Sequence, residues 1–380
     1  MSHVPLHVGV DGRAFASPAG GVRRYVGELY AAMAEHEPDI QVTALGAPAD
    51  VQLPAGVRRR HAIPLPTNLG WMVGTIPLAA RGARLDIYHA PAYTAPLWGV
   101  HPQVLTIHDV SYERRPEWNA YRNDRFRRLF YRRSALAADT IVTDSAFSRD
   151  EIVAAYGIPA EQIEVVPLAA GTSFHPGEFE PLGVPEIVRA PYALHVGDLH
   201  VRRNVTTALA AVLRARAAVP EAARLSLVCA GVDRGTGTAL TEQAHDAGDS
   251  DAVVVLGPVP EPTLVNLYRG AAALLYPSRY EGFGLPILEA MQCGTPVIGA
   301  RCASIPELVG DAGLLLDPLD VDAWTRAIVS VVTDSGARAE LAARSARRAA
   351  QYSWARTARE TAAVFRAAAL SGRRHHHSRG

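Results

Sequence analysis

The sequence predicts an α/β protein of two domains, each built on a doubly wound parallel sheet. Short apolar segments alternate with helical segments along most of the chain, which is the pattern of a parallel sheet covered on both faces. A length of 380 residues is too great for one ordinary core. A stretch rich in proline and glycine, Gly171–Pro191, interrupts the pattern near the middle. We therefore expect a first domain at 1–175, a linker at 176–190, a second domain at 191–352, a C-terminal helix at 353–371 and a disordered tail at 372–380.

In the first domain, short apolar runs predict strands and longer periodic runs predict helices. The expected strands are Leu6–Val10, Gln41–Leu45, Arg58–Ile63, Ile87–His89, Val104–Ile107, Thr140–Val142 and Ile163–Val166. The expected helices are Val22–His36, Asn68–Arg81, Tyr121–Leu136 and Ser148–Tyr156. Ligands of such sheets bind beyond the carboxyl ends of the strands, and His108 follows one of these strands. A histidine that is hydrogen-bonded at a strand end needs no ligand, so the sequence leaves both interpretations open.

Two glycines, Gly20 and Gly21, stand between the first expected strand and the first expected helix. They would let a phosphate or a sugar approach the start of the helix. The segment lacks the G-x-G-x-x-G fingerprint, which disfavours a dinucleotide-dependent dehydrogenase.

The helix expected at Tyr121–Leu136 carries six arginines. Phe126, Leu129, Phe130 and Arg133 fall at spacings that share one helical side. One interpretation is that the aromatic side chains belong to the core and that the arginines form a solvated face. The alternative is a surface for anionic lipid or for a pyrophosphate-linked acceptor.

The second domain opens with a strand–loop–helix unit, Tyr192–Ala215, in which Arg202 and Arg203 precede a helix that Asn204 would cap. Two arginines at a helix start are electrostatically unfavourable. A bound diphosphate would explain them, and two solvated arginines are the alternative. Further strands are expected at Leu225–Ala230, Val253–Leu256 and Ala272–Tyr276, and C-terminal helices at Val321–Val332, Ala337–Ala350 and Trp354–Ala369.

The stretch Tyr276–Val297 reads YPSRYEGFGLPILEAMQCGTPV. A strand enters it, a glycine-rich loop at Glu281–Gly284 follows, and a helix begins near Leu285, with Pro286 suited to its first position. Glycine frees the loop to turn sharply, so that N–H groups of the loop and of the first helical turn can point at one ligand.

Two carboxylates, Glu281 and Glu289, bracket this loop and the start of the helix. Acids that flank backbone amides and the small residues Gly282 and Gly284 suit a ligand with both diols and a phosphate, such as a nucleotide sugar. Two glutamates at this spacing also occur by chance, and a Gly-Pro turn before a buried helix needs no ligand.

Composition argues against several other classes of protein. The net charge is zero, so no overall field favours nucleic acid. The three cysteines lack metal-ligand spacing and indicate reduced thiols. The N-terminus runs directly into a strand without a signal peptide, and no apolar run approaches the ~20 residues that span a bilayer. We expect a cytoplasmic protein, and the sequence leaves open whether it contacts the inner face of an anionic membrane and whether its tail, His375–His377, is native.

The stretch Tyr276–Val297 resembles the Glu-x7-Glu segment of retaining glycosyltransferases with the GT-B fold, family 4. Its continuation Gly299–Pro318 and the segments Asp86–Tyr93 and Thr143–Ile152 also look like this family, so that the resemblance runs from Val10 to about Pro318. It implies two Rossmann-like, doubly wound domains that face a central cleft. The second would bind a nucleotide-sugar donor and the first an acceptor, and the C-terminal helix would cross back onto the first domain.

The resemblance also implies roles for individual residues. His108 would contact the donor sugar at the reaction centre, Arg202 and Arg203 would hold the leaving diphosphate, Glu281 would bind hexose hydroxyls and Glu289 the ribose diol. The expected catalytic residues are therefore His108, Arg202, Arg203 and Glu281, and the expected donor-binding residues are Gly20, Gly21, Val259, Gly282, Phe283, Gly284, Leu285 and Glu289. The chain departs from the family's basic loop, where Arg203 replaces the usual lysine, Val201 the proline, His200 the common acid, and Asp198 an arginine of some members.

The expected function is retaining, metal-independent transfer of a hexose from a nucleotide diphosphate sugar, with GDP-mannose as the first guess. The acceptor would be a hydroxyl of a glycan, a lipid-linked molecule or a small molecule. No cofactor is expected, because the two Asp-x-Asp pairs, Asp249–Asp251 and Asp320–Asp322, lack the context of a metal site. The alternatives are a nucleotide-sugar epimerase of the same fold and a non-catalytic protein that binds sugar nucleotides. The sequence names neither the sugar, the base, the linkage nor the oligomeric state.

Overall fold

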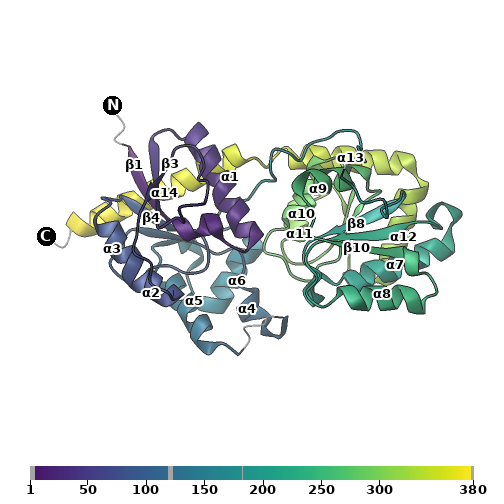
Figure 1. Ribbon diagram of the computed structural model, residues 1–380, viewed down its shortest axis with the longest axis horizontal. Helices are drawn as coiled ribbons and strands as arrows, with labels where there is room; N and C mark the ends of the chain where they lie inside the picture. Colours follow the sequence, from purple (N-terminus) through teal and green to yellow (C-terminus); the bar gives the residue numbers. More distant parts are fainter. Residues whose placement is uncertain (1–4, 119–122, 182, 378–380) are drawn as a thin grey trace. The chain divides into compact units, whose positions relative to one another are not determined.

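The computed structural model describes residues 5–118, 123–181 and 183–377. The chain forms two compact units, each with its own sheet and core (Figure 1). The first unit combines Met1–Leu168 with Ser353–Gly380, and the second unit is Ala169–Tyr352. Both ends of the chain therefore belong to the first unit, whereas the expected linker, 176–190, lies within the second.

The sheet of the first unit is seven-stranded and parallel over the described residues, with the order β3-β2-β1-β4-β5-β6-β7. Its strands are β1 (Leu6–Asp11), β2 (Ile40–Leu45), β3 (Val57–Arg60), β4 (Ile87–Ala90), β5 (Gln103–Thr106), β6 (Thr140–Thr143) and β7 (Ile163–Val165). The order reverses between β1 and β4, which makes their carboxyl ends the topological switch point, where ligands of such sheets bind. All seven strands were predicted within a few residues, although β3 is shorter than expected.

Helices cover both faces of this sheet (Figure 1). On one face, α1 (Gly20–His36) packs against α14 (Trp354–His377). The other face carries α2 (Asn68–Gly70), a π-helical turn (Trp71–Thr75), α3 (Ile76–Arg81), α4 (Ser111–Arg114), α5 (Arg125–Ala137) and α6 (Ala146–Tyr156). Their apolar side chains form one core with the strands, which includes Trp71, Ile76, Tyr88, Phe130 and Ile152. The expected disordered tail, 372–380, begins inside α14, which continues to His377.

One prediction for the arginine-rich helix α5, the burial of both of its phenylalanines, is wrong. Phe130 is buried at 7% exposure, whereas Phe126 is 63% and Leu129 is 51% exposed. The interpretation that both aromatic residues belong to the core is therefore wrong for Phe126. Only the part of α5 from Phe130 onward contributes buried residues, and helical spacing cannot reveal where along a helix its packing partners end. The first residues of the expected helix, 121–122, lie outside the described residues.

The sheet of the second unit is six-stranded and parallel over the described residues, with the order β10-β9-β8-β11-β12-β13. Its strands are β8 (Tyr192–Val196), β9 (Ser226–Ala230), β10 (Val253–Gly257), β11 (Leu274–Tyr276), β12 (Val297–Ala300) and β13 (Leu314–Leu316). Here the order reverses between β8 and β11, so the segments that follow these two strands flank the second switch point.

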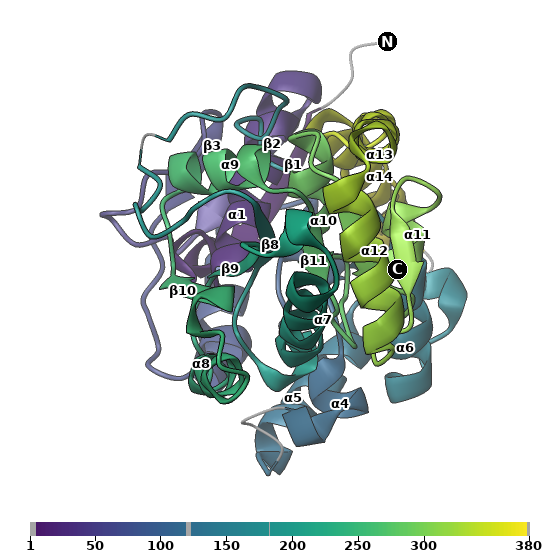
Figure 2. The ribbon, with the colours of Figure 1, turned by 90° about the vertical axis from the view of Figure 1, so that its right-hand side faces the viewer.

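Two sets of helices cover this second sheet (Figure 2). One set, whose members contact α7, is α7 (Val205–Ala218), α8 (Gly237–Asp246) and α12 (Val321–Thr333). The other set, whose members contact α10, is α9 (Glu261–Gly270), α10 (Leu285–Gln292), α11 (Ile305–Val309) and α13 (Ser335–Ala349). The sequence predicted α7, α10 and the C-terminal helices, but it did not predict α8, α9, α11, β12 or β13.

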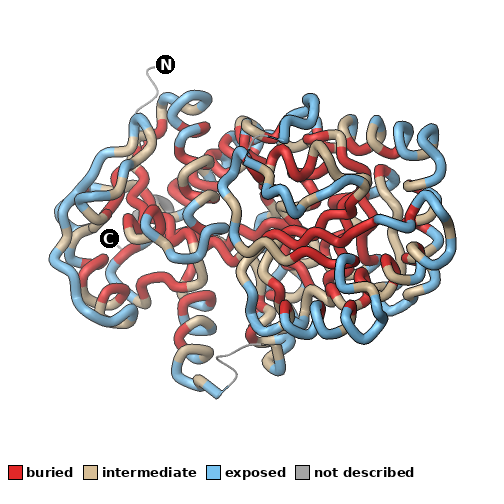
Figure 3. Tube along the Cα trace, turned by 45° about the vertical axis from the view of Figure 1, so that its right-hand side comes forward, coloured by how far each residue is buried: buried red, intermediate tan, exposed pale blue. Residues whose placement is uncertain are grey.

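The strands of both units are mostly buried, whereas the outer sides of the helices are exposed (Figure 3). This confirms the predicted fold class, because a parallel sheet is stable only when helices cover both of its faces. Cys229, Cys293 and Cys302 are free thiols, as expected. Across the described residues, no helix has the length and apolarity to cross a membrane.

Candidate functional site

In the second unit, the segments that follow β8 and β11 bring Arg203 and Glu281 into contact. Nη1 of Arg203 donates hydrogen bonds to Oε1 of Glu281 and to the hydroxyl of Tyr276, and Oγ of Ser278 lies 3.5 Å away. The two charged side chains are only 12% and 7% exposed. The guanidinium also lies over the ring of Tyr276, 5.4 Å from its centroid. Because a charge buried without a partner is costly, the two side chains hold each other in place at the switch point.

Glycine allows the strand ends to approach each other here. Gly231 has a φ of +153°, and a Cβ atom at this position would lie 2.1 Å from the carbonyl oxygen of Gly197. Any side chain would therefore separate the loops that follow β8 and β9. The loop after β8 continues into a short 3₁₀ turn, Val201–Arg203, which directs Arg203 towards β11.

Asn204 is the N-cap residue of α7, as predicted, but its side chain makes no capping hydrogen bond to a backbone N–H of the helix. The residue has a left-handed backbone, with a φ of 54°. Its Nδ2 donates to the carbonyl oxygens of Pro277 at 3.3 Å and Pro318 at 2.6 Å. The side chain therefore connects the arginine turn to the loops after β11 and β13 instead of closing the helix.

The glycine-rich loop leads into α10 as predicted, and Gly284 is the N-cap residue. Gly284 has a φ of 107° and no side chain to cap the helix. Pro286 has no N–H, and the N–H of Ile287 donates to the carbonyl oxygen of Gly284 at 2.9 Å. Such a helix start favours an anion. Leu285 is the first helical residue, so Pro286 stands second and not first. Oγ of Ser304 donates to the carbonyl oxygens of Glu281 at 3.0 Å and Phe283 at 2.9 Å, which fixes the loop.

Glu289 lies inside α10 and is buried. Its Oε2 accepts a hydrogen bond of 2.8 Å from the hydroxyl of Tyr268 on α9. Burial, followed by the charge of Glu289, raises the pKa of Tyr268 well above its ordinary value, so that the phenol remains a donor. Sequence reasoning did not find this partner, because α9 was not predicted.

The remaining predicted residues of the second unit lie near this centre in the chain but make other contacts. Arg202 shares the 3₁₀ turn with Arg203, and its carbonyl oxygen accepts from the N–H of Arg279 at 2.9 Å. Val259 lies in the loop between β10 and α9 and is partly exposed. Gly282 and Phe283 form the loop itself, and the Phe283 ring meets Tyr352 edge-on at 6.1 Å.

In the first unit, Gly20 and Gly21 form the first turn of α1 and not the loop before it. Both are exposed, and a Cβ atom at either would meet no atom within 4 Å. Packing within the chain therefore does not explain why these residues are glycines. Ala19, the N-cap residue, offers no side-chain cap, so the glycines leave the helix start accessible.

His108 lies beyond β5, as predicted, and pairs with Asp144 beyond the neighbouring strand β6. Its Nδ1 is 2.8 Å from Oδ2 of Asp144, and the side chains are 15% and 3% exposed. The imidazole meets the rings of Tyr25 and Tyr93 edge-on, at 4.9 and 6.2 Å. Sequence reasoning missed Asp144, although its place after the next strand of the sheet was a usable signal.

A buried chain of hydrogen bonds supports Tyr25 from behind. Its hydroxyl is 3.1 Å from Oγ1 of Thr106, which is 2.8 Å from Nε2 of His89, and Nδ1 of His89 is 2.6 Å from the hydroxyl of Tyr30. Burial, together with the charge of His108, lowers the pKa of His89 to about 3. His89 therefore stays neutral and acts as part of the framework.

The two Asp-x-Asp pairs have structural partners. Arg216 forms ion pairs with Asp249 and Asp251, and the side chain of Asp320 caps α12 by accepting from the N–H of Ala323 at 2.9 Å. Over the residues that the structure describes, no group of three histidine, cysteine or acidic side chains could hold a metal ion.

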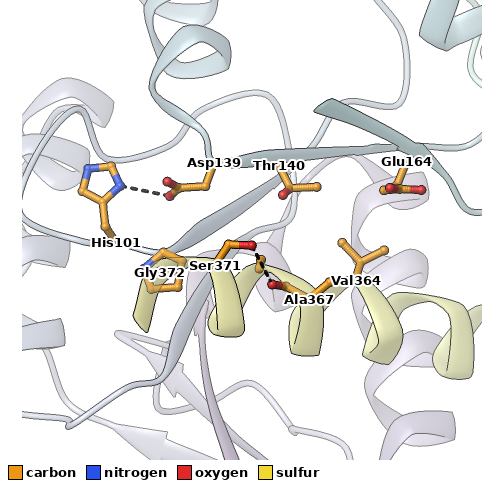
Figure 4. Close-up of a pocket in the computed structure, with 10 residues that line it drawn as sticks. His101, Asp139, Thr140, Glu164, Val364, Ala367, Ser371 and Gly372 are labelled. Carbon is orange, nitrogen blue, oxygen red and sulfur yellow. Dashed lines mark hydrogen bonds and ion pairs between the residues drawn. The ribbon is translucent and has the colours of Figure 1, made fainter. Parts of the chain in front are cut away.

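The first unit also contains a cavity of about 680 Å³ between the sheet and α14 (Figure 4). His101 and Asp139 line it beside the amino ends of β5 and β6, with Val364 and Ala368 of α14 opposite. These strand ends are opposite to those that carry His108 and Asp144. None of the predicted site residues lines the cavity, so the candidate site rests on the strand ends and not on this hollow.

Models of two glycosyltransferase families match the chain. The model described as Glycosyltransferase Family 4 matches residues 19–173, and the model described as Glycosyl transferases group 1 matches residues 190–334. The chain is 35% identical to O-antigen chain mannosyltransferase B of Escherichia coli, over 76% of each protein. The chain belongs to glycosyltransferase family 4. A D-inositol 3-phosphate glycosyltransferase of Thermobispora bispora is 28% identical over 91% of this chain and 90% of its own length.

Solved structures agree with the fold of this family. A sucrose-phosphate synthase from Thermosynechococcus elongatus superposes with a TM-score of 0.75 at 21% identity, over 95% of this chain and 98% of its own. Anabaena HepE, solved with UDP and glucose, gives a TM-score of 0.71 at 18% identity, over 96% of this chain and 100% of its own. These likenesses confirm the GT-B fold of this glycosyltransferase.

Proposed function

We propose that this family 4 glycosyltransferase transfers a hexose from a nucleotide diphosphate sugar, with retention of the anomeric configuration and without a metal ion. The observation that carries the proposal is the buried Arg203–Glu281 pair, which lies beside the uncapped start of α10 at a topological switch point. GDP-mannose is the first donor to test, because a similar protein is a mannosyltransferase. HepE, a structural neighbour, was solved with UDP-glucose, which supports a sugar nucleotide in general.

Arg203 is suited to stabilise a leaving diphosphate. Departure of the nucleoside diphosphate leaves an oxocarbenium-like sugar and places negative charge on the bridging oxygen. Fixed positive charge and backbone N–H groups around that oxygen lower the barrier without a metal. Nε of Arg203 is buried and makes no hydrogen bond with the described residues, so this donor remains for a phosphate oxygen. Arg202 and the amides near Gly284 and Leu285 would complete the set.

The two glutamates would divide the rest of the donor between them. Glu281 would accept hydrogen bonds from hexose hydroxyls, and Glu289, whose carboxylate Tyr268 orients, would accept from the ribose diol. Val259 would contact the base, and Gly20 and Gly21 would admit phosphate or sugar to the start of α1. His108 would contact the donor sugar. The acceptor would attack from the face that the diphosphate leaves, and its proton would pass to a phosphate oxygen.

A donor screen tests this proposal directly. Thermal shift with GDP-mannose, UDP-sugars and dTDP-sugars should show stabilisation by one nucleotide class, since a ligand of the folded state raises its stability. Transfer of the selected sugar to mixed glycan and lipid-linked hydroxyl acceptors is then followed by NMR of the anomeric proton. An inverted product would contradict retention. Donor turnover to an epimeric sugar nucleotide, or binding with neither transfer nor hydrolysis, would replace the proposal with one of the two alternatives.

We also propose that α5 contacts an anionic membrane surface, where a lipid-linked acceptor would reside. Phe126 and Leu129 are exposed. Arg125, Arg128 and Arg132 line a hollow of about 190 Å³ with Leu129 and with Glu113, which forms an ion pair with Arg128. Exposed apolar residues among arginines are typical of helices that lie at a membrane interface.

Co-sedimentation with phosphatidylglycerol vesicles at low salt should detect this contact, and added salt should weaken it. The double variant Phe126→Ser/Leu129→Ser should reduce binding several-fold. Leu370→Ser, which changes an equally exposed apolar residue of α14, serves as the control. Equal binding by both variants would rule out α5 as the contact surface.

A further inference from the structure

Asp144 is a buried carboxylate to which neither the resemblance nor the proposed chemistry gives a role. Its Oδ2 lies 2.8 Å from Nδ1 of His108. The other carboxylate oxygen, Oδ1, and Nε2 of His108 are both buried and make no hydrogen bond with the described residues. Burial of a carboxylate costs free energy, and here one side-chain contact, to an imidazole at the carboxyl end of a strand, offsets it. A purely structural role does not explain this cost.

The backbone around the pair is fixed on both strands. Oγ1 of Thr143 donates to the carbonyl oxygen of Ile107 at 2.7 Å, and Oγ of Ser148 donates to the carbonyl oxygen of His108 at 3.1 Å. The residue before Asp144 and a residue of α6 therefore hold the segment that carries His108. The distance between the carboxylate and the imidazole follows from this backbone and not from two mobile side chains.

A carboxylate on one ring nitrogen decides what the other nitrogen can do. The hydrogen bond to Asp144 keeps a proton on Nδ1 and fixes the plane of the ring. Nε2 is then the nitrogen left for a ligand: it accepts a hydrogen bond from a hydroxyl when the imidazole is neutral and donates one when the imidazole is charged.

We infer that Asp144 is a positioning residue for His108, which holds the imidazole in one orientation and one tautomer so that Nε2 is offered to the sugar. This inference rests on the proposed function for its consequence in transfer, although the state of His108 can be measured without any substrate. It adds a residue from the segment Thr143–Ile152, whose role the sequence left undefined.

Every group that faces His108 bears on its charge. Burial has the largest single effect and lowers the pKa of His108, but the charge and hydrogen bond of Asp144, with smaller contributions from Asp109 and the carbonyl group of Pro91, together raise it above its ordinary value. The rings of Tyr25 and Tyr93 lie against the imidazole, and burial holds the pKa of Tyr25 above its ordinary range, so that this phenol stays uncharged. His89, behind Tyr25, is neutral. Asp144 is therefore the group whose removal changes the state of His108 most.

The test begins with the unaltered protein. Nitrogen-15 histidine NMR, with the His108 signals assigned from a His108→Gln variant, should show an Nδ1–H tautomer and a pKa above 6.5, the ordinary value. Observation of an Nε2–H tautomer that titrates at or below this value would overturn the inference, whatever the variants do.

The variant Asp144→Asn keeps the shape of the side chain and removes its charge. It should lower the pKa of His108 below that of the parent, and it should reduce kcat at least tenfold while the donor KM changes less than threefold. The decline of transfer at high pH should begin at a lower pH than in the parent. Unchanged NMR parameters, or changed parameters with unchanged kcat, would refute the positioning role.

A second histidine–aspartate pair supplies a matched control. Nδ1 of His101 is 3.0 Å from Oδ2 of Asp139 at the amino ends of the same two strands, β5 and β6 (Figure 4). The pair uses the same atoms, but it is about half exposed. Asp139→Asn should leave kcat and the His108 signals unchanged, and an equal loss of transfer in this variant would show that the Asp144 effect is not specific. If the parent transfers no sugar at all, the proposed function fails, and the NMR titration still decides whether Asp144 sets the state of His108.

Discussion

The two units present the same arrangement in two chemical versions. Each places a buried carboxylate against a nitrogen base beyond the carboxyl ends of parallel strands, with a tyrosine ring against the base: Arg203 with Glu281 and Tyr276, and His108 with Asp144 and Tyr25. A guanidinium remains charged at every physiological pH, whereas an imidazole changes charge near neutrality. The second unit therefore offers a constant charge, suited to a diphosphate, and the first unit offers a charge that pH can remove.

The largest effect should follow from removal of the constant charge. Arg203→Ala should lower turnover by about 10² or more, which is the usual cost of losing a group that stabilises an oxyanion. Steady-state transfer assays measure this change. Arg214→Ala is a suitable control, because Arg214 forms an exposed ion pair with Asp322 and such pairs contribute little. Full activity of Arg203→Ala would show that the pair with Glu281 is only structural.

The next prediction separates the two glutamates of the second unit. Glu289→Gln should weaken both the intact donor and free GDP, because a lost charged hydrogen bond costs about 1.5–3 kcal/mol, or roughly ten- to a hundredfold in affinity. Glu281→Gln should reduce transfer but leave GDP binding unchanged or tighter, since it frees Arg203 from its counter-ion. Calorimetry with GDP distinguishes the variants. Equal losses in both would refute the proposed division of the donor.

A smaller effect, the dependence on pH, should distinguish the imidazole of the first unit from the guanidinium of the second. The carboxylate of Asp144 raises the pKa of His108 against the opposing effect of burial, so the charged pair is present below the unfolded pKa of about 6.5 and is lost as pH rises through the higher folded value. Above the folded pKa of His108, the rate of transfer should therefore decline several-fold. The free energy of unfolding of the first unit should decline slightly over the same range. GDP affinity should stay nearly constant over the same range, because a guanidinium keeps its charge there. Parallel decline of both would contradict the contrast between the units.

Chelation should have the smallest effect. If fixed charges and amides replace a metal, EDTA should leave transfer within experimental error of the untreated enzyme. The measurement is a transfer assay after exhaustive dialysis against EDTA, followed by addition of Mn²⁺ or Mg²⁺. Activity that disappears and returns with either ion would contradict a metal-independent mechanism.

Local sequence features predicted the parts of the molecule that local chemistry determines. The alternation of strands and helices gave both parallel sheets, and the Gly-Phe-Gly-Leu-Pro run gave the loop and the start of α10. Contacts between distant segments were not predictable in the same way. Arg203 and Glu281 are 78 positions apart, and His108 and Asp144 are 36 apart, so each pair exists only once the strand order is known. The sequence named three of these four residues but paired none of them.

Two errors have a common physical cause. Phe126 was expected in the core because it shares a helical side with Phe130, and the side chain of Asn204 was expected to cap α7 because it precedes the helix. Residue spacing and position describe the local conformation of one segment, whereas burial and hydrogen bonding depend on which residues of other segments lie opposite it. Asn204 finds the carbonyl oxygens of Pro277 and Pro318, and Phe126 is exposed.

Because α14 packs on the first unit, it determines the order in which the two units can fold during synthesis. Phe365 is fully buried against His89, and Arg366 binds Glu37 and Asp39 near the start of β2. The core of the first unit is therefore incomplete until α14 has been synthesised. The second unit, Ala169–Tyr352, is contiguous and can fold as soon as it emerges, which reverses the usual N-terminal-first order of nascent domains. Until α14 emerges, the face of the first sheet that it covers stays open to solvent, and in a chain that stops before Trp354 this face is never completed.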